Sequence, residues 1–205
     1  MRLLLIRHAE SLNQVYERGD DYAAQRSPDP PLSELGQAQA AALADWARQG
    51  AVFGEITHLF SSPMRRAVQT AAPLAETLGL AVHLSLLAYE WGGVNAGPLG
   101  DFAPVAGGDF ATLQRECPRL LWPAELTGRA WDGGYEAWED ANFTRRARAV
   151  LAELRVVETA GVVALVTHAD FARSLLLTLG RPPVGLQNAE ALFLPCSLGP
   201  HNPLM

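Results

Sequence analysis

Two apolar runs that each end next to a histidine constrain the fold of this chain most. Residues 3–6 (LLLI) precede Arg7 and His8, and the apolar residues of 161–167 precede His168. The first run is continuous rather than alternating, which is typical of a strand buried on both faces of a helix-covered sheet. We therefore expect an α/β fold with a histidine at the end of two buried strands.

A helix is predicted after the first strand and a polar connecting segment. Ser33 is a favourable N-cap, and Gly50 is expected to end the helix near Gln49. The preceding residues 12–31 are expected to form a long loop or a partly helical insertion. The predicted apolar face of the helix holds residues at helical spacing, namely Leu35, Ala38, Ala42, Leu43 and Trp46.

Strands and helices continue to alternate along the chain. Further strands are predicted at 57–61, 80–84 and 189–194, and further helices at 63–79 (capped by Ser62 and kinked or split at Pro73), 136–159 and 170–179. Residues 91–135, rich in Gly, Pro and Trp, are expected to form a small cap or lid. The fold class predicted is a three-layer α/β sandwich, with a mostly parallel central sheet and helices on both faces. Residues 1–205 are expected to form a single domain with the cap inserted at about 91–135.

Composition limits the partners and the compartment. A formal net charge of −6 argues against a nucleic-acid partner, but a local arginine cluster can still hold a small anion. Cys117 and Cys196 lack metal-site spacing and are too few for a disulfide scaffold, so both are expected to be reduced thiols. No apolar segment is long enough for a signal peptide or a membrane span. We therefore expect a cytoplasmic protein without a membrane partner.

The residues at the predicted strand ends indicate phosphate chemistry. A neutral imidazole such as His8 is a nucleophile, and the guanidinium of Arg7 offers a planar fork of donors that matches phosphate. Arg65 and Arg66 form a second cluster at a predicted helix start, where the helix dipole adds positive potential. Together with His168 they predict a pocket for a transferable phosphoryl group. Taken alone, each histidine has a structural alternative, as a buried ring with its hydrogen bonds satisfied.

Four blocks in a fixed order resemble the histidine phosphatase superfamily, the phosphoglycerate mutase-like proteins. Residues 3–11 (LLLIRHAES) are similar to the family's strand followed by Arg-His-Gly-Glu-Ser/Thr. Residues 31–40 resemble the helix signature that follows, 61–71 (SSPMRRAVQTA) the second arginine motif, and 166–170 (VTHAD) the second histidine motif. The combination is far more specific than any single block.

The resemblance implies a role for each matching residue. His8 would be the nucleophile, Arg7 and Arg66 would clamp the phosphate, and His168 would donate to a non-bridging oxygen. Arg66, rather than Arg65, has the motif position. The implied mechanism needs neither a metal nor another cofactor, and no residue cluster has metal-ligand spacing.

The leaving alkoxide needs a proton donor. Glu90 is the first candidate, because residues 86–93 resemble the family's third motif and neighbouring Tyr and Trp rings would desolvate the carboxyl and raise its pKa. Asp170 is the alternative, although it is also suited to capping the next helix. Glu10 is suited either to orienting the pocket or to capping a backbone amide.

Three positions depart from the family pattern. Ala9 stands where Gly is usual, which is acceptable if the backbone there does not require positive φ. The phosphate-binding Asn usually lies six residues after the nucleophile. Gln14 occupies that position here and Asn13 lies one residue earlier, so both amides are candidates. Residues 134–136 resemble the family's Gly-Glu-Ser only loosely, and no site residue is assigned from them.

These residues predict a phosphomonoesterase that hydrolyses a small phosphorylated substrate through a phospho-His8 intermediate. A phosphomutase is the alternative, but it would need to hold a charged sugar acid, and no extra basic cluster lies near the motifs. A non-catalytic phospho-ligand binding protein is disfavoured by the intact histidine and arginine pairs. The substrate, the choice between hydrolysis and mutase transfer, and a homodimer are left open.

Residues 12–31 and 91–135 are the segments expected to set specificity. The second segment carries five Trp and Phe residues, whose large rings either pack it onto the core or line the mouth of the pocket. In the latter case, aryl or nucleoside-like phosphates would be preferred. The five residues are Trp91, Phe102, Phe110, Trp122 and Trp131.

Phosphatase activity is expected to survive extensive dialysis against a chelator, because the arginines already supply the positive charge that a metal would provide. The measurement is the rate of phosphate release before and after dialysis. Loss of activity that Mg²⁺ or Zn²⁺ restores would contradict the metal-independent mechanism.

Overall fold

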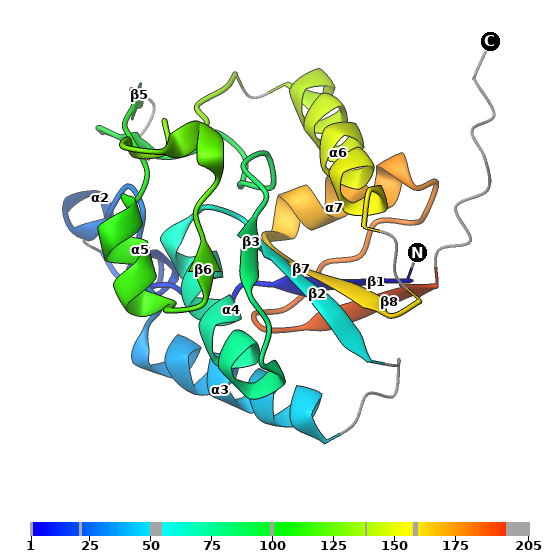
Figure 1. Cartoon of the computed structure of the whole chain (residues 1–205). Helices are drawn as coiled ribbons and strands as arrows, with labels where there is room; N and C mark the ends of the chain where they lie inside the picture. The colour runs from blue at the N-terminus through cyan, green and yellow to red at the C-terminus, as the bar shows by residue number, and fades with distance from the viewer. Residues whose placement is uncertain are drawn as a thin grey trace, which may run out of the picture.

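The central sheet has six strands: β1 (Arg2–Arg7), β2 (Ile56–Ser61), β3 (Val82–Leu84), β6 (Leu120–Leu121), β7 (Val162–Thr167) and β8 (Ala191–Pro195). Their order is β6-β3-β2-β7-β1-β8, and every neighbouring pair is parallel except β1 with β8 (Figure 1). This computed structural model describes residues 2–20, 22–49, 55–98, 101–137, 139–157 and 160–195. Gly50 and Cys196 lie outside the described residues.

Helices cover both faces of the sheet, as Figure 1 shows. One face carries α3 (Glu34–Arg48) and α4 (Arg65–Leu78), and the other carries α6 (Asp140–Arg155) and α7 (Ala169–Thr178). Side chains of β1 alternate between the two cores, with Leu4 and Ile6 in one and Leu3 and Leu5 in the other. Each buried Leu or Ile contributes about 1.5–3 kcal/mol. The predicted three-layer α/β sandwich is confirmed, and burial on both faces explains why β1 is continuously apolar.

Short elements lie in the two segments expected to set specificity. Residues 12–31 contain α1 (Leu12–Tyr16) and α2 (Tyr22–Gln25). Residues 91–135 contain the β4–β5 hairpin (Asn95–Ala96 and Ala103–Pro104), α5 (Phe110–Glu116), strand β6 and the single 3-10 turn η1 (Ala124–Leu126). Strand β6 pairs with β3 at the edge of the central sheet, so this part of the expected cap belongs to the sheet.

Helix α3 buries a different face from the one that the sequence predicts. Its buried residues are Gly36, Ala40, Leu43, Ala44 and Ala47. Of the predicted face only Leu43 is buried, whereas Leu35 and Trp46 are 54% and 36% exposed. The reason is close packing of α3 against α4 and the loop after β1, because small residues allow the helix to approach where Leu and Trp would not fit.

The ends of α3 and α4 show why these helices start and stop where they do. Ser33 caps α3, as predicted, by accepting a hydrogen bond from the Gly36 N–H. Gly79 ends α4 with a φ of 69°, a conformation that favours glycine. Helix α4 begins at Arg65, after Met64 rather than at Pro63, and it runs on through Pro73 without splitting.

Two further properties bear on the expected chemistry. Cys117 is a buried free thiol whose pKa is raised to about 11 by burial, so it is a poor nucleophile at neutral pH. In the part of the chain that the structure describes, none of the helices has the length and apolarity needed to cross a membrane.

Replacing Gly36 by Ala is expected to destabilise the protein by about 1–3 kcal/mol through overpacking. An added Cβ would lie 2.0 Å from the Glu10 carbonyl oxygen, although Ala normally favours a helix over Gly. The free energy of unfolding in urea measures the effect. Gly185→Ala is the control, since its Cβ would meet open space. Equal stability of the two variants would contradict this account of α3 packing.

Candidate active site

The parallel register of β1 and β7 places the two predicted histidines side by side. Arg7 pairs with Thr167, and the next residue on each strand is a histidine. The His8 N–H donates to the Thr167 carbonyl over 2.8 Å, which extends the ladder by one residue. The two imidazole centroids lie 5.0 Å apart at the carboxyl edge of the sheet, where open α/β sheets commonly bind ligands.

His8 is held as a neutral imidazole with its Nε2 lone pair facing Arg66. Nδ1 lies 2.7 Å from the Ala9 carbonyl, which can only accept, so Nδ1 carries the proton. Nε2 accepts from Arg66 Nε over 3.2 Å. Burial, followed by the charges of Arg66 and Arg7, holds the pKa of His8 well below 6.5. Ala9 is not among the described residues with positive φ, so the alanine fits this position.

His168 presents an unused ring nitrogen beside His8. Its Nε2 lies 2.8 Å from Ser62 Oγ, whose own lone pair accepts from the Met64 N–H. Ser62 is fully buried, and His168 Nε2 is the acceptor that the described residues offer its hydroxyl, so the hydroxyl is assigned as the donor to Nε2 and the ring proton to Nδ1. That Nδ1 is buried and has no hydrogen-bond partner among the described residues. Burial and then Arg66 hold the pKa of His168 well below its usual value. The sequence pattern predicted Ser62 only as a helix cap and not as a residue of the site.

The arginines separate into pocket residues and a structural pair. Arg66 contacts His8, and Arg7 donates to the Leu186 carbonyl while its buried Nε has no partner among the described residues. Arg65 instead forms a bidentate ion pair with Glu116, over 2.8 and 3.0 Å from Nε. The geometry thus brings Arg7 and Arg66 to the histidines and turns Arg65 away.

Asp29 is a buried carboxyl near this cluster that the sequence analysis missed. Its Oδ1 accepts from the Arg65 N–H over 3.0 Å at the start of α4. Burial raises the pKa of Asp29, while the charge of Arg66 opposes that shift. Desolvation lowers the pKa of Arg66, and Asp29 is the largest influence in the opposite direction. Asp29 thus supports a charged guanidinium at the base of the site.

A cavity of about 430 Å³ opens above these groups. Its base includes Arg7, His8, Arg66 and Glu90. Both expected specificity segments contribute to its walls, with Tyr22, Arg26, Trp91, Asn95 and Phe102. Of the five aromatic residues considered above, Trp91 and Phe102 line this cavity, whereas Phe110, Trp122 and Trp131 do not.

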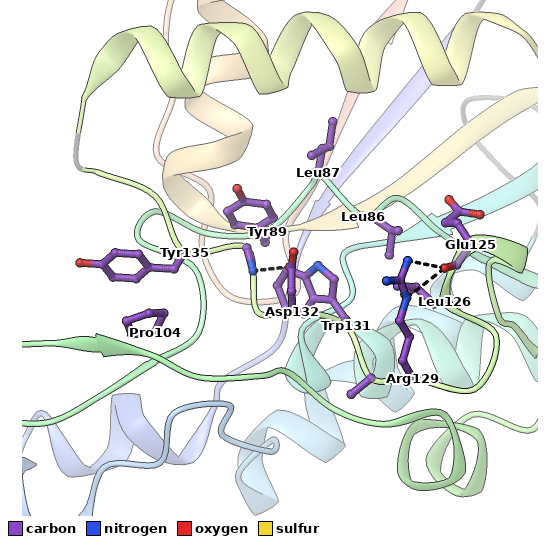
Figure 2. Close-up of a pocket in the computed structure, with 12 residues that line it drawn as sticks. Leu86, Leu87, Tyr89, Pro104, Glu125, Leu126, Arg129, Trp131, Asp132 and Tyr135 are labelled. Atoms are coloured by element: carbon purple, nitrogen blue, oxygen red, sulfur yellow. Dashed lines mark hydrogen bonds between the residues drawn. The ribbon is translucent and has the colours of Figure 1, made fainter.

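A second, larger cavity of about 660 Å³ lies beside the turn that leads to Glu90 (Figure 2). Its lining includes Leu86, Tyr89, Trp131 and Arg129. None of the predicted site residues lines it. The predicted residues Arg7, His8, Arg66 and Glu90 therefore lie at the smaller of these two cavities.

Glu90 lies at the N-terminus of α7. Its carboxylate accepts from the backbone N–H groups of Trp91, Phe171 and Asp170 over 3.0, 3.2 and 3.3 Å. Burial is the largest influence on Glu90 and raises its pKa, and the charge of Asp170 adds to that effect. Asp170 also lines the cavity but is exposed. Glu90 is the better placed of the two for holding a proton.

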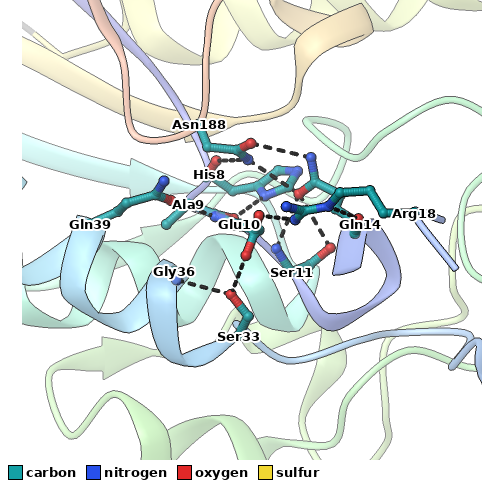
Figure 3. A network of polar contacts seen from close by, with 10 residues as sticks. All are labelled: His8, Ala9, Glu10, Ser11, Gln14, Arg18, Ser33, Gly36, Gln39 and Asn188. Carbon is teal, nitrogen blue, oxygen red and sulfur yellow. Dashed lines mark hydrogen bonds and ion pairs between the residues drawn. The ribbon is translucent and has the colours of Figure 1, made fainter. Parts of the chain in front are cut away.

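Asn13 and Gln14 both line the cavity, but their amides hold the loop after β1. Asn13 exchanges two hydrogen bonds of 2.9 Å with the Ser27 backbone. Gln14 Oε1 accepts from the Ser11 N–H, and its Nε2 donates to Asn188 Oδ1 over 3.3 Å (Figure 3). Each amide nitrogen carries two N–H groups and donates one of them in these contacts, so Asn13 and Gln14 both stay candidates for contact with a phosphate.

Residues 186–190, which are distant in sequence, bind the backbone at Arg7 and His8. Asn188 donates to the His8 carbonyl over 3.1 Å (Figure 3). The Ala189 N–H donates to the Arg7 carbonyl. Ala189 has a φ of 58°, a strained value for a residue other than glycine. No sequence motif marks this segment, because its contribution comes from backbone contacts.

Glu10 connects the same loop to α3. Its carboxylate accepts from Ser33 Oγ over 2.7 Å and pairs with Arg18 (Figure 3). The Ser33 hydrogen bond is the main reason that the pKa of Glu10 is lowered. Glu10 therefore orients the loop that carries His8, and it is absent from the lining of the cavity.

Comparison with solved structures gives several close matches in fold. A protein described as mycobacterial hydrolase 1 is 26% identical, with a TM-score of 0.61 over 94% of this chain and 90% of the other. A mycobacterial glucosyl-3-phosphoglycerate phosphatase in complex with VO3 is 27% identical, with a TM-score of 0.59 and the same two coverages. A mutant phosphoserine phosphatase from Entamoeba histolytica, in complex with phosphoserine, is 20% identical over 94% and 89%, with a TM-score of 0.59. That last likeness shows the fold alone.

The family comparison covers nearly the whole chain. No curated protein gives a match. The family model described as "Histidine phosphatase superfamily (branch 1)" matches residues 3–198. The match includes both strand-end histidines and the arginine cluster of α4. The chain therefore belongs to branch 1 of the histidine phosphatase superfamily.

Proposed function

We propose that this protein is a phosphomonoesterase that transfers a phosphoryl group to His8 and then to water. One observation carries the proposal: His8, which lines the cavity, has a neutral ring whose Nε2 accepts from Arg66 and whose centroid lies 5.0 Å from that of the His168 ring. Membership of the family and the phosphatases among the similar structures support this function. In this proposal the substrate is a small phosphorylated molecule.

In the first step, the phosphate is held by Arg7, Arg66 and the Nδ1–H of His168. The Arg66 N–H now bonded to His8 Nε2 moves to a phosphate oxygen, which frees the lone pair for attack on phosphorus. The N–P bond forms as the P–O bond to the leaving group breaks. Charge that builds on the equatorial oxygens is stabilised by guanidinium groups already in position.

Glu90 is proposed to move the protons. Burial raises its pKa, and in this mechanism the carboxyl starts protonated and donates to the leaving oxygen as the P–O bond breaks. The resulting carboxylate accepts a proton from the water that attacks the phosphohistidine. The products are an alcohol and inorganic phosphate, and both His8 and Glu90 return to their starting protonation states.

A phosphomutase remains the alternative, and one observation favours it. Arg26 adds a basic group to the cavity wall that the sequence analysis did not expect there. It donates to Asn95 Oδ1 over 2.8 Å and lies over the Phe102 ring, while its buried Nε has no partner among the described residues. A trapped phosphoenzyme distinguishes the two functions, because a phosphatase transfers its phosphoryl group to water and a mutase to an added phosphate acceptor.

His8→Ala is expected to abolish turnover, because in this mechanism no other group forms the covalent intermediate. His168→Ala and Arg66→Ala are expected to lower kcat by about 10²-fold or more, with the fold retained. Phosphate release across a panel of phosphomonoesters measures the rates, and rapid quenching with a labelled substrate measures the phosphoenzyme. Near-normal turnover by His8→Ala would end the phosphohistidine proposal.

The pH dependence of kcat/KM for an alkyl phosphate is expected to be bell-shaped, with its optimum on the acid side of neutrality. His8 reacts as the neutral base, and its lowered pKa moves the acid limb well below pH 6.5. Glu90 reacts as the acid, and its raised pKa moves the alkaline limb upward. Glu90→Gln is expected to remove the alkaline limb. After correction for the substrate's own ionisation, an acid limb at pH 6.5 or above would contradict the neutral, buried His8.

A further inference from the structure

Arg146 on α6 is a completely buried arginine outside the cavity of the proposed reaction. Its exposed fraction is 0%, and it is absent from the residues that line the cavity. Its Nε donates to Glu136 Oε1 over 2.8 Å, and Nη2 donates to the same oxygen. The charge is therefore paired, but nothing in the proposed mechanism uses it directly.

The remaining donors of Arg146 point at the turn that precedes Glu90. Nη1 donates to the carbonyl oxygens of Leu87 and Tyr89 over 2.7 and 2.8 Å. Thr167 Oγ1 donates to the carbonyl between them over 2.8 Å. Three successive carbonyls are thus fixed immediately before Glu90. Figure 2 shows Leu87 and Tyr89 on this turn, beneath the long yellow-green helix α6.

Arg146 also packs against Phe171, whose backbone N–H binds the Glu90 carboxylate. Its guanidinium lies 3.7 Å from the centroid of the Tyr89 ring and 4.8 Å from those of Phe143 and Phe171. The Phe171 N–H is one of the donors to Glu90. One side chain therefore packs against the residue before Glu90 and against a residue that binds its carboxylate.

Stability alone is a weak reason for an arginine at this position. A buried ion pair carries a desolvation cost, and apolar replacements of similar volume are often neutral or stabilising. Glu136 also has one buried oxygen without a partner among the described residues, which adds to that cost. What an apolar side chain would not supply is the set of donors aimed at the Leu87 and Tyr89 carbonyls.

We propose that Arg146 is a positioning residue, which fixes the turn at residues 87–89 and thereby aims the Glu90 carboxyl at the leaving group. This inference rests on the proposed role of Glu90 as proton donor. It predicts that loss of Arg146 harms the reactions that need a proton donor and spares those that do not. A residue that merely stabilises the fold would affect both kinds of reaction equally.

The test compares kcat/KM for an alkyl phosphate with kcat/KM for p-nitrophenyl phosphate. An alkoxide needs protonation to leave, whereas p-nitrophenolate leaves without it. Because kcat/KM covers the steps up to release of the alcohol, later hydrolysis of the phosphoenzyme does not contribute. The ratio of the two values is also independent of the folded fraction, so a poorly folding variant still gives a result.

Four variants are measured. Glu90→Gln is expected to lower the alkyl value about 10²-fold or more, with a change of at most about threefold for p-nitrophenyl phosphate. Arg146→Lys and the double variant Arg146→Met with Glu136→Leu are expected to lower the alkyl value about tenfold or more, with the same selectivity. The double variant leaves no unpaired charge in the core. Arg148→Lys is the matched control on an exposed position of α6, and neither value is expected to change.

The outcomes separate this inference from the proposed function. Unchanged values or equal losses on both substrates in the Arg146 variants would overturn the positioning role. If Glu90→Gln itself shows no selectivity for the alkyl substrate, the donor assignment fails and the Arg146 inference fails with it. Phosphoenzyme trapping on His8 then still reports independently whether the protein acts through a phosphohistidine.

Discussion

The site depends on the in-register parallel pairing of β1 with β7. Arg7 lies opposite Thr167, so the residue that follows each strand reaches the same edge of the sheet, and both of these residues are histidines. The ladder of hydrogen bonds continues for one more residue, because the His8 N–H donates to the Thr167 carbonyl. On the other side of β7, the backbone N–H of Ser62, the residue after β2, donates to the Val166 carbonyl in the same way. A slip of one residue would turn every side chain to the opposite face, exchange the two apolar cores and separate the rings.

Burial gives these groups their chemical character. Desolvation and nearby guanidinium charge both oppose protonation of His8 and His168, so both imidazoles are held in the neutral form beside cationic side chains. The same desolvation acts in the opposite sense on the Glu90 carboxyl and raises its pKa. Burial therefore shifts the pKa values of His8 and Glu90 in opposite directions within one cavity, downward for the imidazole and upward for the carboxyl.

Local patterns predicted the elements of the fold better than they predicted its packing. The strands, the Ser33 cap and the Gly79 stop follow from rules that act over a few residues. The buried face of α3 did not follow, because large apolar residues usually mark a core face, whereas close approach to α4 selects small ones. The place of β6 in the central sheet was also missed, since a two-residue strand carries almost no periodicity.

The sequence by itself determined which chemical groups are present and the order in which the strands deliver them. The arginine-histidine pair, the second arginine cluster, His168 and Glu90 are all visible as motifs. The motif position already favoured Arg66 over Arg65 as the arginine that faces the histidines. Only the tertiary structure decided which distant residues hold the site in place. Asn188 and Arg146 act through backbone carbonyls at His8, Leu87 and Tyr89. Because every residue carries a backbone carbonyl, the sequence does not show which carbonyls accept hydrogen bonds from Asn188 and Arg146.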